Sequence, residues 1–218
     1  MRQILGALLL AFSFGANAAL IDLYERDLNN YDDALLTYDS TTGLEWLDLT
    51  ESGGYSFNSM ILELNDSGSA FYGFRHASKA EVLALTVTAG LTILNIPLES
   101  MHADVIALQN LVSMNHAESD KTIGFTGTQT PTDYPSCTFS ISVGTCHYLF
   151  MLDSNNGYGT VIENAGATRD NAIVTLEAHW LVRDANVVPV PAAVWLFGSD
   201  LGLLGWMRKL QVGADKHA

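Results

Sequence analysis

Two cysteines carry the first chemistry that can be read from this 218-residue chain. Cys137 and Cys146 have eight residues between them in SCTFSISVGTCHYLF. In an exported chain, an even number of cysteines indicates a disulfide that closes a short loop. A zinc site is poorly supported, because no second Cys/His pair stands at zinc-ligand spacing. Thiol catalysis with His147 is also disfavoured, since adjacent residues of a strand point to opposite faces.

The histidines and carboxylates form no recognisable catalytic pattern. Four of the histidines are scattered along the chain: His76, His116, His147 and His179. A lone histidine is more often a satisfied surface or core residue than a ligand. The sequence has no G-x-S-x-G elbow, no H-E-x-x-H, no phosphate-binding glycine loop and no dinucleotide fingerprint. We therefore expect no catalytic residues, no metal ligands and no cofactor.

The charge balance excludes one class of partner. The formal net charge of the chain is −14. Residues 19–184 contain six Lys and Arg and twenty-two Asp and Glu, and 6 − 22 gives −16 for this part. Nucleic acid is excluded, because phosphate binding needs clustered basic side chains. The acidic surface favours solubility; attraction of a cation such as Ca²⁺ stays an alternative, although no oxygen-ligand loop is visible.

Three segments have the pattern of amphipathic helices. SFNSMILELN, residues 56–65, has apolar residues at spacings of three and four. Ser78 and Glu81 form a capping box at the start of the second helix, which Gly90 should end. The third helix is expected within residues 98–115, after Pro97.

The strand patterns predict a mostly antiparallel sheet. LLTYDSTTGLEWLDL reads as two strands around a turn at Gly43, and HYLFMLDSNNGYGTVIE reads as strand, turn and strand. VTLEAHWLVR, residues 174–183, alternates as one strand, whereas TIGFTGTQTPTDYPS, residues 122–136, is typical of a loop. The expected fold class is α+β, with two or three helices.

The N-terminus has the features of a secretory signal peptide. Arg2 precedes the apolar segment 4–14, and residues 16–18 form a small-x-small cleavage site. Cleavage would fall between Ala18 and Ala19.

The C-terminus contains an apolar run long enough to cross a bilayer. Residues 187–207 are twenty-one residues, interrupted by Pro189 and Pro191 and followed by Arg208 and Lys209. Basic residues after an apolar span hold that end in the cytoplasm, so the bulk of the chain should lie outside.

The string VPVPAAVWLFGSDLGLLGW resembles the PEP-CTERM signal that exosortases recognise, in the variant with a hydrophobic residue between the prolines. Asp200 departs from the family, which usually has a small or apolar residue there. The resemblance implies a transient stay in the inner membrane of a Gram-negative bacterium and cutting by an exosortase near Pro189–Pro191. The residues that carry the motif are Val188, Pro189, Val190, Pro191, Trp195, Phe197, Gly198, Ser199, Arg208 and Lys209.

The two terminal signals define the expected organisation of the chain. It consists of a signal peptide (1–18), an exported α+β domain (19–184), a linker with the Pro-containing motif (185–191), a single transmembrane helix (192–207) and a cytoplasmic basic tail (208–218).

A second resemblance concerns the exported domain. TTGLEWLDL, GFRHASKAEVLAL and the closing HWLVR are similar to the DUF1566/Lcl-type domain, which has a T-G-L-x-W start, a W-R-L-P-[ST]-x-x-E-L segment and a final V-R strand. The middle segment departs from the pattern, with Phe74 for Trp and Val82 for Leu. The resemblance implies a divergent member of a family thought to be related to C-type-lectin-like folds.

Two functions are compatible with these features. The first is a non-enzymatic exported protein that an exosortase sorts to the cell surface or the exopolysaccharide matrix. The alternative is an extracellular glycan- or ligand-binding module with a lectin-like loop face. Trp46 and Trp180 are expected in the core, whereas aromatic residues of the loop region mark where a binding surface could lie: Tyr134, Tyr148 and Tyr158.

Overall fold

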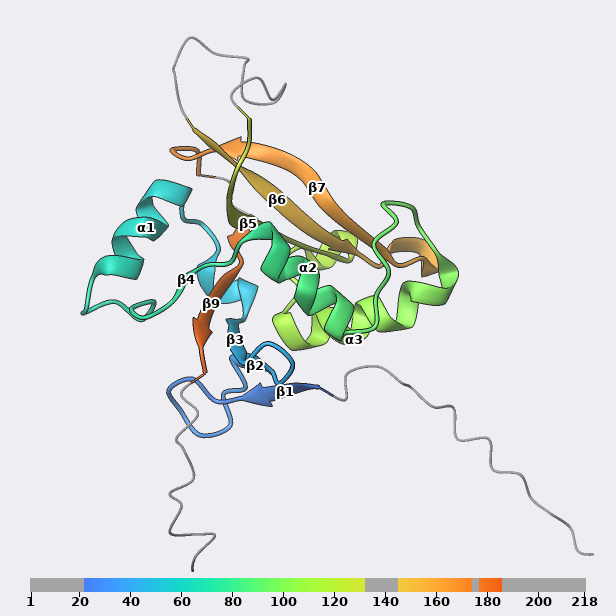
Figure 1. Ribbon diagram of the computed structural model, residues 1–218, viewed down its shortest axis with the longest axis horizontal. Coiled ribbons are helices and arrows are strands. Elements are labelled where there is room, and N and C mark those ends of the chain that lie inside the picture. The colour runs from blue at the N-terminus through green and yellow to red at the C-terminus, as the bar shows by residue number, and fades with distance from the viewer. Residues whose placement is uncertain (1–21, 132–144, 174–176, 186–218) are drawn as a thin grey trace, which may run out of the picture. The chain divides into compact units, whose positions relative to one another are not determined.

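A computed structural model describes residues 22–131, 145–173 and 177–185 (Figure 1). In this part of the chain, three α-helices and nine strands form an α+β fold, as predicted. The elements are β1 (Leu23–Arg26), β2 (Leu36–Asp39), β3 (Leu44–Leu47), η1 (Leu49–Ser52), α1 (Phe57–Asn65), β4 (Arg75–His76), α2 (Lys79–Thr88), η2 (Glu99–Met101), α3 (His102–Val112), η3 (Ala117–Ser119), β5 (Lys121–Gln129), β6 (Cys146–Asp153), η5 (Asn155–Gly157), β7 (Thr160–Arg169), β8 (Ala178–His179) and β9 (Leu181–Asp184).

The strands form two sheets. The first has the order β1-β2-β3-β9-β4, and all its pairs are antiparallel. The second has the order β7-β6-β5-β8, in which only the β5–β8 pair is parallel. The turn between β2 and β3 contains Gly43 at φ 74°, a left-handed conformation that glycine adopts without steric cost.

The predicted loop at residues 122–136 is wrong over its first part, because β5 continues to Gln129. The glycines of β5 permit close packing in the structure. A Cβ on Gly124 would lie 2.9 Å from the indole of Trp180, and one on Gly127 would lie 3.2 Å from Cβ of His76. Glycine inside a strand often marks such a close approach.

The single closing strand predicted for residues 174–183 is also corrected. Its described part divides at Trp180 into β8, which pairs with β5, and β9, which pairs with β3 and β4. Backbone bonds at Trp180 reach both sheets, since its N–H donates to Phe125 O at 2.9 Å and its O accepts from Ala77 N at 2.8 Å. Where the chain passes from the second sheet to the first, the side chains on both faces of the strand are buried. The alternation of apolar and polar residues in this segment therefore does not separate a core face from a solvent face.

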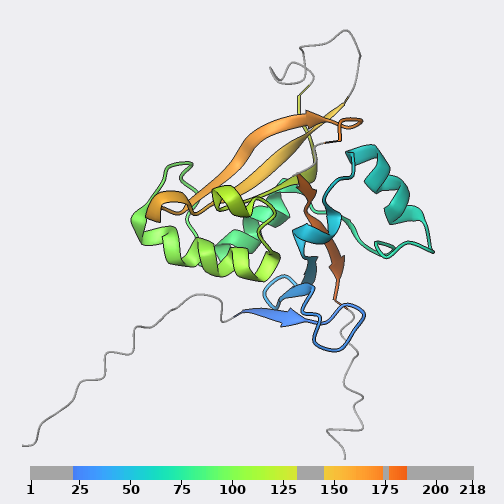
Figure 2. The same ribbon diagram turned by 180° about the vertical axis from the view of Figure 1, so that it is seen from behind.

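Helices α1 and α2 begin where the sequence predicts, and α3 lies within the predicted segment 98–115. Ser56 caps α1 by accepting a hydrogen bond from Ser59 N, and Ser78 forms the predicted capping box with Glu81 at the start of α2. Gly90 follows α2 with φ 78°, as a C-terminal stop requires. Figures 1 and 2 show α2 and α3 on one side of the five-stranded sheet and α1 on the other.

Of the three hydrophobic clusters in the described residues, the two largest hold the helices against the first sheet. The larger one joins α2 and α3 to both sheets and contains Trp46 and Trp180, which are 1% and 0% exposed. Their rings meet edge to face with centroids 6.2 Å apart. The smaller cluster packs Met60 and Leu64 of α1 against Leu47 and other residues on the opposite face of the first sheet. The expected core position of both tryptophans is confirmed.

Within the described residues, no helix has the length and apolar composition needed to span a bilayer. The signal peptide, the Pro-containing motif and the transmembrane helix predicted for residues 192–207 lie outside the described residues.

Candidate functional site

Three histidines that are far apart in the sequence come together around one phenylalanine. Phe57, the first residue of α1, stacks on His147 with ring centroids 3.5 Å apart and on His76 at 4.1 Å. His179 lies 5.1 Å from His76, measured between ring centroids, and stacks on Phe125 at 5.0 Å. We call His76, His147 and His179 with these two phenylalanines the imidazole cluster.

Hydrogen bonds determine the tautomers of two members. Nε2 of His179 lies 3.2 Å from Tyr55 O, which can only accept, so this nitrogen carries the proton. Nδ1 of His179 therefore accepts from Nε2 of His76 at 2.9 Å. Nδ1 of His76 remains a buried acceptor, and it has no hydrogen-bond partner among the described residues.

Both of these histidines are neutral in the folded protein at pH 7. Burial, together with the nearby His179 and His147, lowers the pKa of His76 to about 3. Burial likewise lowers the pKa of His179 to about 4, against the opposing hydrogen bond to Tyr55.

The third histidine belongs to a buried acid–imidazole pair. Nδ1 of His147 lies 2.7 Å from Oδ1 of Asp170, which directly follows β7. The other carboxylate oxygen accepts from the hydroxyl of Thr145. The backbone of Asp170 also holds α1, since its O accepts from Asn58 N at 2.8 Å. The pair thus fixes the hairpin β6–β7 to the start of α1.

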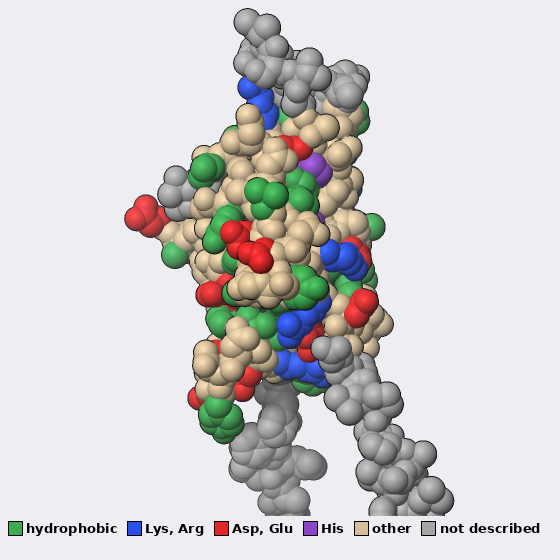
Figure 3. All heavy atoms as spheres, turned by 90° about the vertical axis from the view of Figure 1, so that its left-hand side faces the viewer, with side chains coloured by type: hydrophobic (Ala, Val, Ile, Leu, Met, Phe, Trp, Pro, Cys, Tyr) green, Lys and Arg blue, Asp and Glu red, His purple; other side chains and the backbone are tan. Residues whose placement is uncertain are grey.

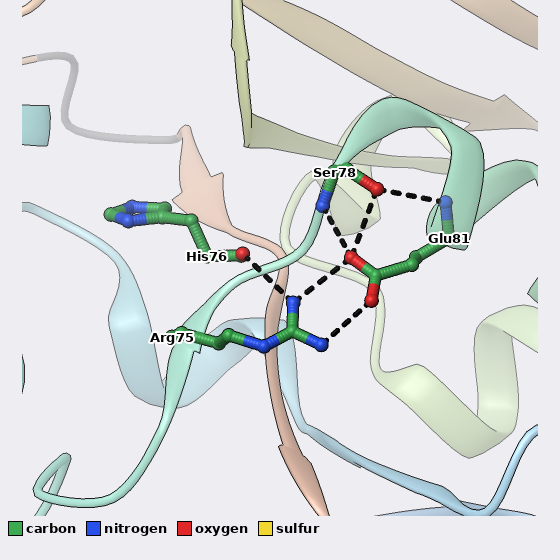
Figure 4. A network of polar contacts seen from close by, with 4 residues as sticks. All are labelled: Arg75, His76, Ser78 and Glu81. Atoms are coloured by element: carbon green, nitrogen blue, oxygen red, sulfur yellow. Dashed lines mark hydrogen bonds and ion pairs between the residues drawn. The ribbon is translucent and has the colours of Figure 1, made fainter.

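A polar network at the start of α2 positions His76 (Figure 4). The carboxylate of Glu81 accepts from Ser78 N at 2.8 Å and from Arg75 Nη1 and Nη2 at 2.9 and 2.7 Å. These bonds, led by the one from Arg75, lower the pKa of Glu81 to about 2. His76 lies between Arg75 and Ser78 in the chain, and Figure 4 shows its ring directed away from the network.

An oriented Asp–His pair is one half of a general-base relay, which also needs a nucleophile within hydrogen-bond reach of the imidazole. His147 is only 4% exposed, and its ring is covered by Phe57. In the described ranges, no three His, Cys, Asp or Glu side chains are grouped to hold a metal ion. Figure 3 shows only a small patch of histidine atoms on the face that it presents. The histidines and Asp170 therefore form a polar network within the core.

Sequence reasoning treated these histidines as isolated residues. The expectation was a satisfied surface or core residue at each position. His147 and His179 are buried and hydrogen-bonded, as a satisfied core residue is, but they are not isolated from each other. They come from β4, β6 and β8, so no local spacing could have indicated the cluster. Asp170 was missed for the same reason.

The structure describes only one of the two cysteines in the predicted disulfide. Cys146, the first residue of β6, is 3% exposed and takes part in a disulfide. Cys137 lies outside the described residues, so the pairing of the two stays a prediction.

An open hollow lies at the turn between β6 and β7. Its volume is about 430 Å³, within the range of about 300–1,000 Å³ for small-molecule sites. Polar side chains from this hairpin and from the loop after α2 line it: Asn95, Asp153, Asn155, Asn156, Tyr158 and Thr160. Tyr158 is one of the three tyrosines that mark, in the sequence, where a binding surface could lie. Tyr148 lies in β6, and Tyr134 lies outside the described residues.

Comparison of the chain with protein-family models, curated proteins and solved structures finds no match.

Proposed function

We propose that this chain is a non-enzymatic exported protein, which an exosortase sorts through a C-terminal PEP-CTERM signal. The proposed destination is the cell surface or the exopolysaccharide matrix. One structural observation carries most weight: the described fold closes before the Pro-containing motif. β9 ends at Asp184, between β3 and β4 in the first sheet, and Ala185 N donates to Gly43 O at 2.9 Å. A cut near Pro189–Pro191 would therefore leave the described domain intact.

The chemistry of the domain supports a non-enzymatic role. Its acid–imidazole pair, His147 and Asp170, is buried under Phe57 and ties structural elements together. The mixed acidic, basic and hydrophobic surface in Figure 3 has no concentrated basic patch on the face shown, in keeping with a domain that does not bind nucleic acid.

We further propose that the domain is a divergent relative of the DUF1566/Lcl-type, C-type-lectin-like domains. The three segments that carry this resemblance are neighbours in space. The first contains β3, the second contains β4 and the start of α2, and the third contains β9, and β9 pairs with both β3 and β4. Motifs separated by most of the domain thus form one structural unit.

The proposal is tested by mass spectrometry of the mature C-terminus. We expect a new C-terminus near residues 189–191 in cells that have the exosortase, and the full-length chain in cells that lack it. The same C-terminus in both strains would refute sorting by an exosortase.

A second candidate function is an extracellular glycan- or ligand-binding module. The hollow beside Tyr158 favours it, because it combines an exposed aromatic ring with several polar side chains. The buried tryptophans play no part in this candidate, since neither ring is available to a sugar.

A further inference from the structure

The walls of the hollow are fixed by backbone contacts. The loop after α2 and the turn of the β6–β7 hairpin are joined at Leu98 and Gly159, whose N–H and O groups bond reciprocally at 3.0 and 2.9 Å. Gly159 also packs against the backbone of η2, where an added Cβ would lie 2.4 Å from Met101 O. The two walls therefore keep their spacing without a ligand, which lowers the entropic cost of binding.

Two asparagines that line the hollow have a constrained backbone conformation. Asn156 and Asn95 have φ values of 56° and 51°, the left-handed conformation that asparagine tolerates better than most residues. Asn155 N donates to Oδ1 of Asp153 at 3.0 Å, which fixes the start of the turn.

Four polar side chains that line the hollow, three amides and one hydroxyl, leave their hydrogen-bonding capacity unused within the described residues. Within the described residues, the side-chain amides of Asn95, Asn155 and Asn156 make no hydrogen bond to the fold. The same holds for the hydroxyl of Thr160, although Thr160 is only 7% exposed. An amide offers two donors and one acceptor, so these groups can satisfy the paired donors and acceptors of neighbouring hydroxyls.

An aromatic ring stands beside these polar groups. Tyr158 is 40% exposed and lines the hollow. The backbone at Tyr158 is held by a contact with α3, because Tyr158 O lies 3.4 Å from Nδ1 of His102. A partly exposed aromatic ring in this position can pack against the C–H groups of a saccharide.

The charge in the hollow is balanced. Its carboxylate, Asp153, is paired with Lys121, with Nζ and Oδ2 3.6 Å apart. An anionic ligand would find no unpaired cation among the lining residues, and a cationic ligand would compete with Lys121. The remaining polar groups are neutral amides and hydroxyls.

We infer that this hollow binds a neutral saccharide unit of a polysaccharide, through the amides of the β6–β7 turn and the ring of Tyr158. This inference rests on the second candidate function and deepens it by naming the site and the ligand class. Recognition uses neutral donors and acceptors and needs no bridging cation.

The test is a titration of the full-length chain, in mild detergent, with the neutral polysaccharides dextran, mannan and laminarin and with the anionic polysaccharide alginate. We expect binding to at least one neutral polysaccharide, unchanged by EDTA, and none to alginate. Tyr158→Ala and Asn155→Ala should each weaken binding about tenfold, the factor for one good contact. Asn155 is chosen because alanine would be strained at Asn95 or Asn156.

Two further variants complete the test. Thr160→Val keeps the shape of a buried side chain and removes its hydroxyl, so it should also weaken binding. Tyr72→Ala removes a tyrosine of comparable exposure, 57%, that does not line the hollow, and should leave binding unchanged. Thermal unfolding of each variant checks that the fold is retained.

Each result has a separate meaning. Neutral polysaccharide binding that is insensitive to the Tyr158, Asn155 and Thr160 variants would overturn the site but retain the second candidate function. Binding to alginate alone, or loss of binding in EDTA, would overturn the ligand class and its cation-independent recognition. Absence of all binding would refute the second candidate function as well, while C-terminal processing remains an independent test of sorting.

Discussion

Nε2 of His76 lies 2.9 Å from Nδ1 of His179, although 103 positions separate the two residues in the chain. His76 belongs to β4 in the five-stranded sheet, and His179 belongs to β8 in the four-stranded sheet. This neutral imidazole pair therefore joins the two sheets.

The pair predicts a pH-dependent stability. The pKa values of His76 and His179 fall from 6.5 to about 3 and about 4 on folding, so below pH 6.5 the unfolded chain binds protons that the folded domain does not. The unfolding free energy should then decrease as the pH is lowered, by at most about 1.4 kcal/mol per pH unit for each histidine. Chemical denaturation of the chain between pH 7 and about pH 5 measures this slope.

One buried carboxyl opposes this trend. Asp48 accepts from the Ser113 hydroxyl at 2.6 Å, and burial raises its pKa from 3.8 to about 6, so the folded domain takes up a proton here before the unfolded chain does. Replacing both histidines, as His76→Asn with His179→Asn, should remove the acid-induced loss and leave the opposite slope from Asp48. An unchanged slope in this double variant would contradict the assignment.

Glu81→Gln should weaken the connection between β4 and α2. The carboxylate of Glu81 accepts from Arg75 and from Ser78, and an amide cannot replace all these bonds. Loss of a helix cap typically costs about 1 kcal/mol, which would show as a lower urea midpoint. Glu118→Gln, at an exposed position of η3, is the matched control and should leave the midpoint unchanged. Equal midpoints for both variants would refute a stabilising role for the network.

Gly124→Ala should destabilise the domain although alanine suits most strands as well as glycine does. The added Cβ would lie 2.9 Å from the Trp180 side chain and 3.0 Å from Leu49, and neither has space to withdraw in the core. Overpacking of this kind costs about 1–3 kcal/mol. Gly68→Ala is the control, because its Cβ would come no closer than 3.4 Å to Asp66. A thermal scan in which both variants unfold together would contradict this prediction.

The predicted disulfide has a direct chemical readout. Thiol labelling of exported, unreduced protein should find no free thiol, because Cys146 is disulfide-bonded and Cys137 is the other cysteine of the chain. Labelling after unfolding and reduction is the control and should modify both cysteines. Reduction should lower stability by about 2–3 kcal/mol, as expected for a short closed loop. Stoichiometric labelling without reductant would refute the pairing.

The sorting proposal makes a prediction for the Pro-containing motif. Changing Pro189 and Pro191 together to alanine should leave the full-length chain in the inner membrane, because the proposed recognition element is lost. Pro131→Ala, a proline before the predicted loop disulfide and outside the motif, should be processed normally. Pulse-chase with membrane fractionation distinguishes precursor from processed protein. Normal trimming of the double variant would show that the segment serves only as an anchor.

The sequence alone located the three helices and two of the hairpins, β2–β3 and β6–β7, of the described domain. Their signals are local: Ser56 and Ser78 cap helices within three residues of themselves, and Gly43 and Gly90 take positive φ where a turn or a helix end needs it. Such features depend on neighbours in the chain, so pattern and propensity are sufficient to locate them.

Only the tertiary structure decided the role of β5, the division of the closing strand at Trp180 and the meeting of the histidines. Gly124 is a strand residue because an indole from another element needs the space that a side chain would fill. His76, His147 and His179 become one cluster because β4, β6 and β8 converge on Phe57. Contacts between distant segments depend on how the sheets pack, and periodicity within a segment carries no information about that packing.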